Sequence, residues 1–485
     1  MIEITRLLAR KLRTVFRRAS RKAVAFEQYV SFEAHGDGLR ARLHHGEVLV
    51  EYQQSGIFPT ETVVLPLDAL GDFEGKCETP VTLEQAPDKT VRVRWNEGVV
   101  PQEKEYGIPS SNPIDKYPDL PEKMTVNEPT LLRALADAKD SAAREETKYA
   151  TRNIQLRGAS GTLVATDGHE LLAQSGFQMP WTEDVLVPAV PIFACRELLQ
   201  GGPLRIGKSA SHVTLQSGPW TLHLPIDAQG RYPPTDQVIP SLTGSETRLT
   251  IDPQDGAFLT KTLPSLPGDE ANSPVTLDLN GEVCIRAKAA GQERTTEVLL
   301  ARSHASDKAV RFLLNRNLLA RALALGFSEI HVVKPDTPVL CQDASRKLVL
   351  MPLGKDGALK PTDDAIRIPS AEGETAHPKQ QTERRNPVVK SASEPKPLIE
   401  SGAKAASENG ASHAKSNGIT KEKTGRSGIS ALIAEAEALK GILRDAFNRS
   451  RQLISAIRRH KKQAHAVQAT LESLASLRQI QRIDG

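Results

Sequence analysis

Residues 163–173 read LeuValAlaThrAspGlyHisGluLeuLeuAla, and this stretch is the clearest indication of the fold. Two apolar runs flank the dipeptide Asp167-Gly168, a common pair in tight turns between antiparallel strands. The stretch therefore predicts a β-hairpin that turns at these two residues.

Residues 1–353 contain three copies of a similar pattern. In each copy a glycine turn lies next to β-rich sequence, as at 45–52, 161–166 and 280–287. Each copy also has a strand that runs directly into a helix, and a repeated spacing of this kind indicates a repeated structural unit. The matching points of these junctions are Pro66, Pro188 and Asn315. Two of the copies close on similar tripeptides, Lys116-Tyr117-Pro118 and Arg231-Tyr232-Pro233.

Each copy begins with a helical stretch. We predict helices over Arg6–Lys22 and Pro129–Lys148, and a shorter one around Ala257–Leu263 that Pro264 ends, because proline cannot continue a helix. The sequence therefore predicts an α+β fold of three repeated domains. Their expected bounds are 1–123, 124–242 and 243–354.

Three segments in this order resemble the bacterial DNA polymerase III beta subunit, the sliding clamp family. They are the run from Leu163, GlyArgTyrProProThrAspGlnValIlePro at 230–240, and LeuValLeuMetProLeu at 348–353. The resemblance implies a DNA clamp fold, with sheets outside and helices lining a ring. In this family two subunits join head to tail around duplex DNA, and the protein is a non-catalytic processivity subunit.

Charge is distributed unevenly along the chain. Residues 1–22 carry +7, 354–428 carry +3 and 429–485 carry +5, whereas residues 23–353 carry −11. An acidic body with a few basic helices accepts a polyanion on one face only. With the resemblance, the expected DNA contacts are Arg10, Lys11, Arg13, Arg17, Arg18, Arg21, Lys139, Arg144, Lys148 and Tyr149, with Arg196 and Arg316 as weaker candidates.

The basic N-terminal helix has two other interpretations. Its apolar side, with Ile4, Leu8 and Leu12, is also typical of a charged helix that is simply solvated. An amphipathic, arginine-bearing start is also typical of an organellar targeting peptide. The helix fills the position that the first repeat requires, which favours a structural part of the fold.

The resemblance also implies a pocket for short peptides of DNA polymerase, the clamp loader and other clamp-binding proteins. An apolar pocket with flexible side chains suits many such partners. An ordinary strand core is the alternative for Met351 and Leu353. By motif position the pocket residues are Thr166, Gly168, His169, Leu171, Pro233, Val238, Val349, Met351, Pro352 and Leu353.

Two features depart from the family pattern. Glu170 stands where the family usually has Arg, which predicts a reversed charge at the pocket rim. The first helix of the third repeat offers Lys261 as its only base. Two functions therefore stay open: a sliding clamp that encircles DNA as a homodimer for processive replication, and a clamp-fold paralogue that is a protein-interaction scaffold or regulator without encirclement.

Residues 355–428 contain no Phe, Trp or Tyr and are rich in Ser, Pro, Gly and Lys, which predicts a disordered linker. Beyond it, apolar or small residues recur in steps of four and three from Leu432 to Leu474. This spacing predicts a basic helical extension over 429–485, either a coiled coil between chains or a helical hairpin.

The sequence contains no motif for catalysis. His169 and Asp167 lack a third orienting group, and we find no phosphate loop, paired-carboxylate motif or metal-ligand cluster. We therefore expect no enzyme activity, no cofactor and no metal. Four widely spaced cysteines and the lack of an apolar run long enough for a membrane predict a cytoplasmic protein, at the nucleoid of a bacterium.

Overall fold

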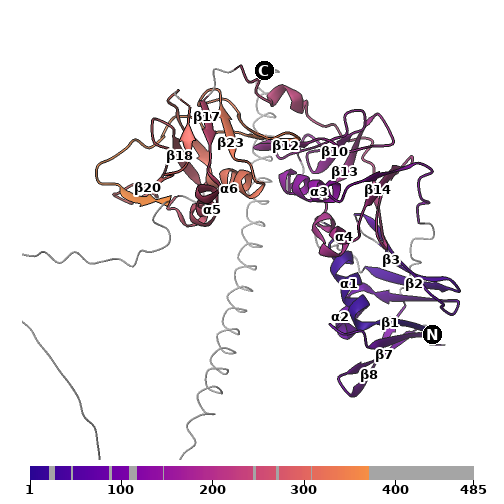
Figure 1. The fold of residues 1–485 in the computed structure, drawn as a ribbon. Coiled ribbons are helices and arrows are strands. Elements are labelled where there is room, and N and C mark those ends of the chain that lie inside the picture. Colours follow the sequence, from indigo (N-terminus) through magenta and orange to yellow (C-terminus); the bar gives the residue numbers. More distant parts are fainter. Residues whose placement is uncertain are drawn as a thin grey trace, which may run out of the picture. The chain divides into compact units, whose positions relative to one another are not determined.

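The computed structural model describes residues 1–20, 28–44, 47–86, 90–108, 117–145, 147–243, 247–268, 272–306 and 308–370 (Figure 1). They belong to one compact unit, Met1–Thr382, whereas a second unit, Glu383–Gly485, lies wholly outside the described residues. The helical extension over 429–485 and the linker beyond residue 370 therefore stay predictions. Within the described part of the chain, no helix is long and apolar enough to cross a membrane.

The three repeats follow one order of elements: a strand, a helix, four strands, a second helix and three strands, with one short additional strand, β21, before β22 in the third repeat. The first has β1 (Ile2–Thr5), α1 (Arg6–Phe16), β2 (Tyr29–His35), β3 (Gly38–His44), β4 (Leu49–Ser55), β5 (Glu61–Pro66), α2 (Leu70–Phe73), β6 (Pro80–Gln85), β7 (Thr90–Glu97) and β8 (Val100–Gly107). The second has β9 (Met124–Asn127), α3 (Thr130–Ser141), β10 (Asn153–Arg157), β11 (Thr162–Thr166), β12 (Glu170–Gln174), β13 (Asp184–Pro188), α4 (Arg196–Leu199), β14 (Leu204–Lys208), β15 (His212–Ser217) and β16 (Trp220–Pro225). The third has β17 (Thr247–Thr250), α5 (Pro253–Thr262), β18 (Pro274–Asp278), β19 (Cys284–Ala287), β20 (Thr296–Leu299), a short β21 (His304–Ala305), β22 (Arg311–Asn315), α6 (Arg316–Ala324), β23 (Glu329–Val332), β24 (Val339–Gln342) and β25 (Arg346–Leu350), followed by β26 (Ile366–Pro369).

The strand register confirms the repeat. Each predicted matching point ends the strand before the second helix, and each pairs with the first residue of the second strand of its repeat. These pairs are Tyr29 with Pro66, Asn153 with Pro188, and Pro274 with Asn315. Positions in different repeats can therefore be equated residue by residue by counting along the ladders from these pairs.

Two sheets run across the boundaries between repeats. In the eight-stranded sheet β4 pairs antiparallel with β16, and we call this contact joint 1. In the nine-stranded sheet β12 pairs antiparallel with β25, and we call this contact joint 2. A four-stranded sheet, β1-β6-β7-β8, and a five-stranded sheet, β22-β18-β19-β20-β26, complete the fold.

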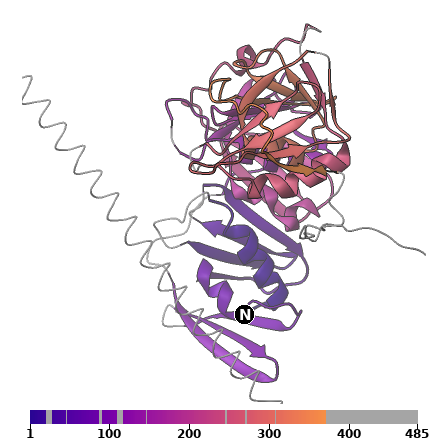
Figure 2. The ribbon, with the colours of Figure 1, turned by 90° about the vertical axis from the view of Figure 1, so that its left-hand side faces the viewer.

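The helices lie on one face of the sheets in all three repeats (Figure 1), and Figure 2 shows the first repeat in indigo and violet after a quarter turn. Helix α1 shows why: Leu8, Leu12 and Phe16 recur at helical spacing and are buried against the strands. The Thr5 hydroxyl caps its first turn by accepting a hydrogen bond from the Leu8 amide at 3.1 Å.

The helices are shorter than the sequence predicts. Helix α1 ends at Phe16 rather than Lys22, and residues 21–27 lie outside the described part. Helix α3 ends at Ser141 rather than Lys148. Its end has a tertiary cause, because Ala142 turns to an extended conformation and the Ala143 amide donates to the Thr151 carbonyl at 2.9 Å. Helix α5 agrees better, since a 3-10 turn at Leu263–Ser265 follows it where Pro264 was expected to end it.

The predicted linker starts too early. Residues 355–370 belong to the described part, and β26 adds a fifth strand to the outer sheet of the third repeat. Their order comes from contacts with the sheet, which a local composition without aromatic residues does not indicate. The prediction of disorder from residue 355 is therefore wrong up to residue 370.

Candidate functional site

A cavity of about 370 Å³ lies at joint 2, between the second and third repeats. Its walls come from the loop before β10, the β11–β12 turn, the segment that connects the two repeats, and the end of β25. The lining residues are Thr147, Tyr149, Thr151, Thr166, Asp167, Gly168, His169, Glu170, Leu171, Pro233, Pro234, Thr235, Val238, Val349 and Met351.

The floor of this cavity is apolar because of the strand register. Leu171 of β12 lies opposite Val349 of β25, and both point to the face of the sheet that the helices leave free. With Val164 and Leu340 they form a buried cluster that is separate from the two main cores. Tyr232 and Ile239 of the connecting segment pack against this cluster from outside.

The β11–β12 turn satisfies its own polar groups. Asp167 Oδ1 accepts the amides of His169 at 2.8 Å and Glu170 at 2.9 Å, and Gly168 has a φ of +92°, which glycine adopts freely. The Thr166 hydroxyl donates to the Glu170 carbonyl at 2.6 Å. Asp167 therefore has the structural role that its place in a turn predicts.

Eight of the ten predicted pocket residues line the cavity, and two do not. Met351 lines it, and its amide donates to the His169 carbonyl at 2.9 Å. Pro352 and Leu353 do not line it, because the chain turns away toward β22, where the Leu353 amide donates to the Leu313 carbonyl at 2.8 Å. Sequence reasoning missed Thr147, Thr151, Pro234 and Thr235, although Thr147 lies beside the expected DNA contacts Lys148 and Tyr149.

Glu170 does not place a free charge at the rim. Its side chain is buried and pairs with Arg321 of α6, Nε to Oε1 at 2.8 Å. Arg321 also donates to the Asp137 carbonyl and to the Ser141 hydroxyl of α3, at 2.6 and 2.8 Å. Burial raises the pKa of Glu170, and Arg321 opposes that shift. The expected charge reversal at the rim is therefore wrong, since this carboxylate joins the second repeat to the third.

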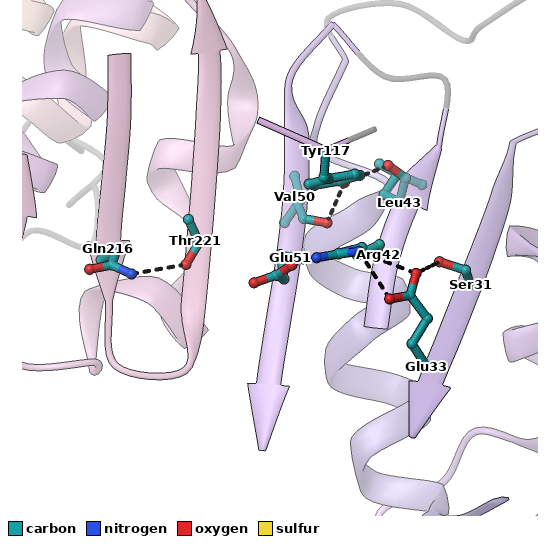
Figure 3. Close-up of polar contacts among 9 residues, drawn as sticks. All are labelled: Ser31, Glu33, Arg42, Leu43, Val50, Glu51, Tyr117, Gln216 and Thr221. Atoms are coloured by element: carbon teal, nitrogen blue, oxygen red, sulfur yellow. Dashed lines mark hydrogen bonds and ion pairs between the residues drawn. The ribbon is translucent and has the colours of Figure 1, made fainter. Parts of the chain in front are cut away.

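A buried tyrosine stands at each joint. Tyr232 donates its hydroxyl to the Val164 carbonyl at 3.2 Å, next to the cavity floor. At joint 1, Tyr117 donates to the carbonyls of Leu43 at 2.7 Å and Val50 at 2.9 Å (Figure 3). The two tyrosines are the centres of the two tripeptides that close the first and second repeats.

The expected DNA contacts on α1 fall into two groups. Arg10 and Lys11 are exposed, and neither has an ion pair among the described residues. Arg13 pairs with Glu74 and Arg17 with Asp68, each at 2.6 Å, so acids near α2 neutralise part of their charge. Arg18 is exposed at the end of the helix, and Arg21 lies outside the described residues.

The later candidates are less uniform. Lys139 lies on α3 and pairs with its neighbour Asp140, whereas Arg144 and Lys148 are exposed in the loop after α3 rather than on the helix. Tyr149 lines the cavity, with the Lys148 ammonium 6.0 Å from its ring centre.

Two candidates on the second helices differ sharply. Arg196 is exposed at the start of α4. Arg316 of α6 is buried, and its guanidinium donates to the carbonyls of Leu263, Leu266 and Pro267. Arg316 closes the 3-10 turn after α5, so its weaker candidacy as a DNA contact is wrong.

No protein-family model and no curated protein matches the sequence. Solved structures do match. The DNA polymerase III subunit beta of Pseudomonas aeruginosa has a TM-score of 0.60 at 19% identity and covers 73% of this chain and 99% of its own. The sliding clamp of Bartonella birtlesii, bound to griselimycin, has a TM-score of 0.62 at 18% identity and covers 73% and 98%. A putative beta subunit of Eubacterium rectale has 0.61 at 13% and covers 72% and 98%.

These chains are matched over nearly their whole length, which leaves the C-terminal quarter of this protein without a counterpart in them. The match agrees with the three repeats and with the resemblance of the three sequence segments. Residues 1–370 therefore have the α+β fold of the DNA polymerase III beta sliding clamps.

Proposed function

We propose that this protein is a DNA sliding clamp, which encircles duplex DNA as a ring of two copies and tethers polymerase and other clamp-binding proteins. The protein would have no catalytic activity of its own. A closed ring stays on DNA by topology, so individual phosphate contacts can be weak enough to permit sliding.

The apolar cavity at joint 2 is the observation that carries the proposal. A short peptide with an apolar anchor fits a cavity of about 370 Å³ whose floor includes Leu171 and Val349. A second, more polar hollow of about 530 Å³ shares Pro233, Pro234 and Thr235 with it and includes Arg157 and Arg231. The hollow also includes Asp184 and Asp236, and Arg157 pairs with Asp236 at 2.8 Å. The two together therefore suit an apolar anchor followed by a polar flank.

Met351 and Leu353 provide a matched test of this pocket. Both are partly exposed apolar residues, at 41% and 39%, and they are two positions apart, but only Met351 lines the cavity. We expect Met351→Ala to weaken a polymerase-derived clamp-binding peptide by more than about 1 kcal/mol, and Leu353→Ala to leave its affinity unchanged. Fluorescence anisotropy measures both, with melting curves to check folding. Equal affinity in the two variants would count against this pocket.

DNA contact has its own matched pair. Arg10 is exposed on α1, and Arg205 is exposed on β14, whose neighbours Leu204 and Ile206 point toward the helix side. Arg205 therefore lies on the opposite face of the sheet. We expect Arg10→Glu to lower the slope of log affinity against log salt by about 0.9, and Arg205→Glu to leave the slope unchanged. Equal slopes would remove α1 from the DNA-facing surface.

The second candidate, a clamp-fold scaffold or regulator without encirclement, is favoured by one observation. Arg13 and Arg17 are paired with acids, and α5 offers Lys261 as its only base, which weakens the helix layer as a polyanion surface. Retention on circular DNA, with loss on linearised DNA after loading, separates the two functions. A scaffold would bind the peptide but show no such difference.

A further inference from the structure

The three repeats present three equivalent strand edges, and each edge is occupied. In the first repeat β16 covers the edge of β4, and in the second β25 covers the edge of β12, both antiparallel and both from the next repeat. In the third repeat β26 covers the edge of β20. It differs from the other two because it runs parallel and comes from the chain's own C-terminal side.

The equivalence extends to the side chains on that edge. In the first repeat Arg42 pairs with Glu33 and Glu51, and the same ladder positions in the third repeat hold Arg286, which pairs with Asp278 and Glu297. Glu51 lies opposite Thr221 of β16. Glu297 lies opposite Arg367 of β26 and pairs with it, Nε to Oε2 at 3.2 Å.

Residues 354–370 reach this edge by crossing the sheet and are fixed along the way. The Leu359 amide donates to the Thr276 hydroxyl at 2.9 Å, and the Ile366 amide to the Thr295 carbonyl at 2.8 Å. At the end Ser370 is buried and donates its hydroxyl to Asp255 Oδ1 at 2.6 Å. Burial alone would raise the pKa of Asp255, but hydrogen bonds from Ser370 and Ser303 hold it below its usual range.

β26 ends the sheet instead of extending it. Backbone N–H groups alternate sides along a strand, so the N–H groups of Ile366 and Ile368 point to β20. The backbone nitrogens of Arg367 and Pro369 lie on the outer edge. Proline has no N–H, which leaves Arg367 as the only backbone donor of these four residues on the outer edge. A further strand would find few hydrogen-bond partners there.

The counterpart of the β20 edge is β8. In the sheet β1-β6-β7-β8 it holds the place that β16 and β25 hold in the later repeats, and its outer edge pairs with no strand among the described residues. By the same register, Glu103 of a second copy's β8 would lie opposite Glu297 of β20, which places two like charges side by side. In the present structure β26 instead places Arg367 opposite Glu297. The resident strand therefore has the better charge match.

We propose that β26 is an intramolecular cap on the docking edge for a second copy of this chain, so that β8 of one copy joins β20 of another only after β26 leaves. The tether gives β26 an effective concentration in the millimolar range. A second copy at ~1 µM must therefore bind the edge about a thousandfold better than β26 to displace it. The proposal rests on the proposed function only for the identity of the partner as a second copy.

Ile368 offers the release variant and its control in the full-length protein. Ile368→Pro removes an amide that faces β20, whereas Ile368→Thr keeps it. We expect Ile368→Pro to dimerise at a concentration at least about tenfold lower than wild type and Ile368→Thr, as measured by sedimentation. Any association through residues 371–485 is common to all three proteins. Equal association of all three would overturn the proposal.

A locked variant tests the same edge from the other side. Thr296 and Ile366 are register partners on β20 and β26, so Thr296→Cys with Ile366→Cys, in a Cys77→Ser background, permits a short bis-maleimide link. We expect the linked protein to associate more weakly than the unlinked one. Equal association would show that β26 does not compete.

Hydrogen exchange distinguishes a second copy that displaces β26 from one that adds outside it. In the associated Ile368→Thr protein, we expect the amides of residues 366 and 368 to lose protection while those of β20 keep it. Continued protection of β26 would overturn the proposal, because the second copy would then add outside it. Peptide binding at joint 2 by the linked protein is a separate readout, and its loss would count against the proposed function rather than against the cap.

Discussion

Joints 1 and 2 have the same strand register, and they differ in the side chains on the face that the helices leave free. At four equivalent positions joint 1 has polar or charged groups where joint 2 has apolar ones. The pairs are Arg42 and Val164, Glu51 and Ala173, Thr214 and Leu340, and His223 and Val349.

The difference decides what the connecting segment does at each joint. At joint 1 the Tyr117 ring lies over the polar groups, with the Arg42 guanidinium 4.9 Å from its centre (Figure 3). The His223 ring lies 5.9 Å from the Tyr117 ring. At joint 2 the apolar floor faces a cavity. A pocket therefore depends on which side chains a joint carries, since the backbone pairing is common to both.

Removing Arg42 should have the largest effect. Its guanidinium pairs with Glu33 at 2.9 Å and Glu51 at 2.6 Å, and Arg42→Val leaves both carboxylates without this partner at a mostly buried site. We expect a loss of about 3 kcal/mol in the free energy of unfolding. Arg42→Val with Glu51→Ala recreates the Val164 and Ala173 pair of joint 2 and should recover part of that loss. Denaturant unfolding measures both, and a double variant no more stable than the single one would contradict this account of joint 1.

His223 should make joint 1 sensitive to acid. Burial lowers its pKa to about 4, and His212 and Arg42 add to the shift. Below the unfolded pKa of about 6.5 the unfolded chain takes up a proton that the folded chain refuses, so stability falls as the pH falls toward 4. Between pH 7 and 5 we expect wild type to lose about 2 kcal/mol more than His223→Gln. Unfolding curves at the two pH values measure this, and parallel losses would show that His223 titrates normally.

The sequence predicts the elements whose signals are local. The Asp167-Gly168 turn, the matching points Pro66 and Pro188, and the end of α5 near Pro264 all depend on residues within a few positions of one another. The apolar pocket positions were also reachable, because the repeat and the resemblance together place them on one joint.

The contacts that sequence reasoning missed are formed between distant residues. Glu170 meets Arg321 at a separation of 151 residues, and Ser370 meets Asp255 at 115, so no local pattern indicates either contact. A count of bases also cannot tell Arg10, which is exposed, from Arg316, which is buried against backbone carbonyls. For the same reason composition alone misses the order of residues 355–370.

The smallest expected effects come from removing the hydroxyl groups of Tyr117 at joint 1 and Tyr232 at joint 2. Tyr117→Phe leaves two buried carbonyls, those of Leu43 and Val50, without a side-chain donor, whereas Tyr232→Phe leaves only that of Val164. The two carbonyls share the single hydroxyl hydrogen of Tyr117, so at ~1 kcal/mol per full hydrogen bond we expect Tyr117→Phe to cost about 1.5 kcal/mol and Tyr232→Phe about 1 kcal/mol or less. Because the Tyr232 ring still packs on the floor of joint 2, peptide affinity should not change in Tyr232→Phe. Unfolding curves and peptide anisotropy measure the two effects. A larger loss at Tyr232 would mean that its hydroxyl, rather than the apolar floor, maintains the cavity.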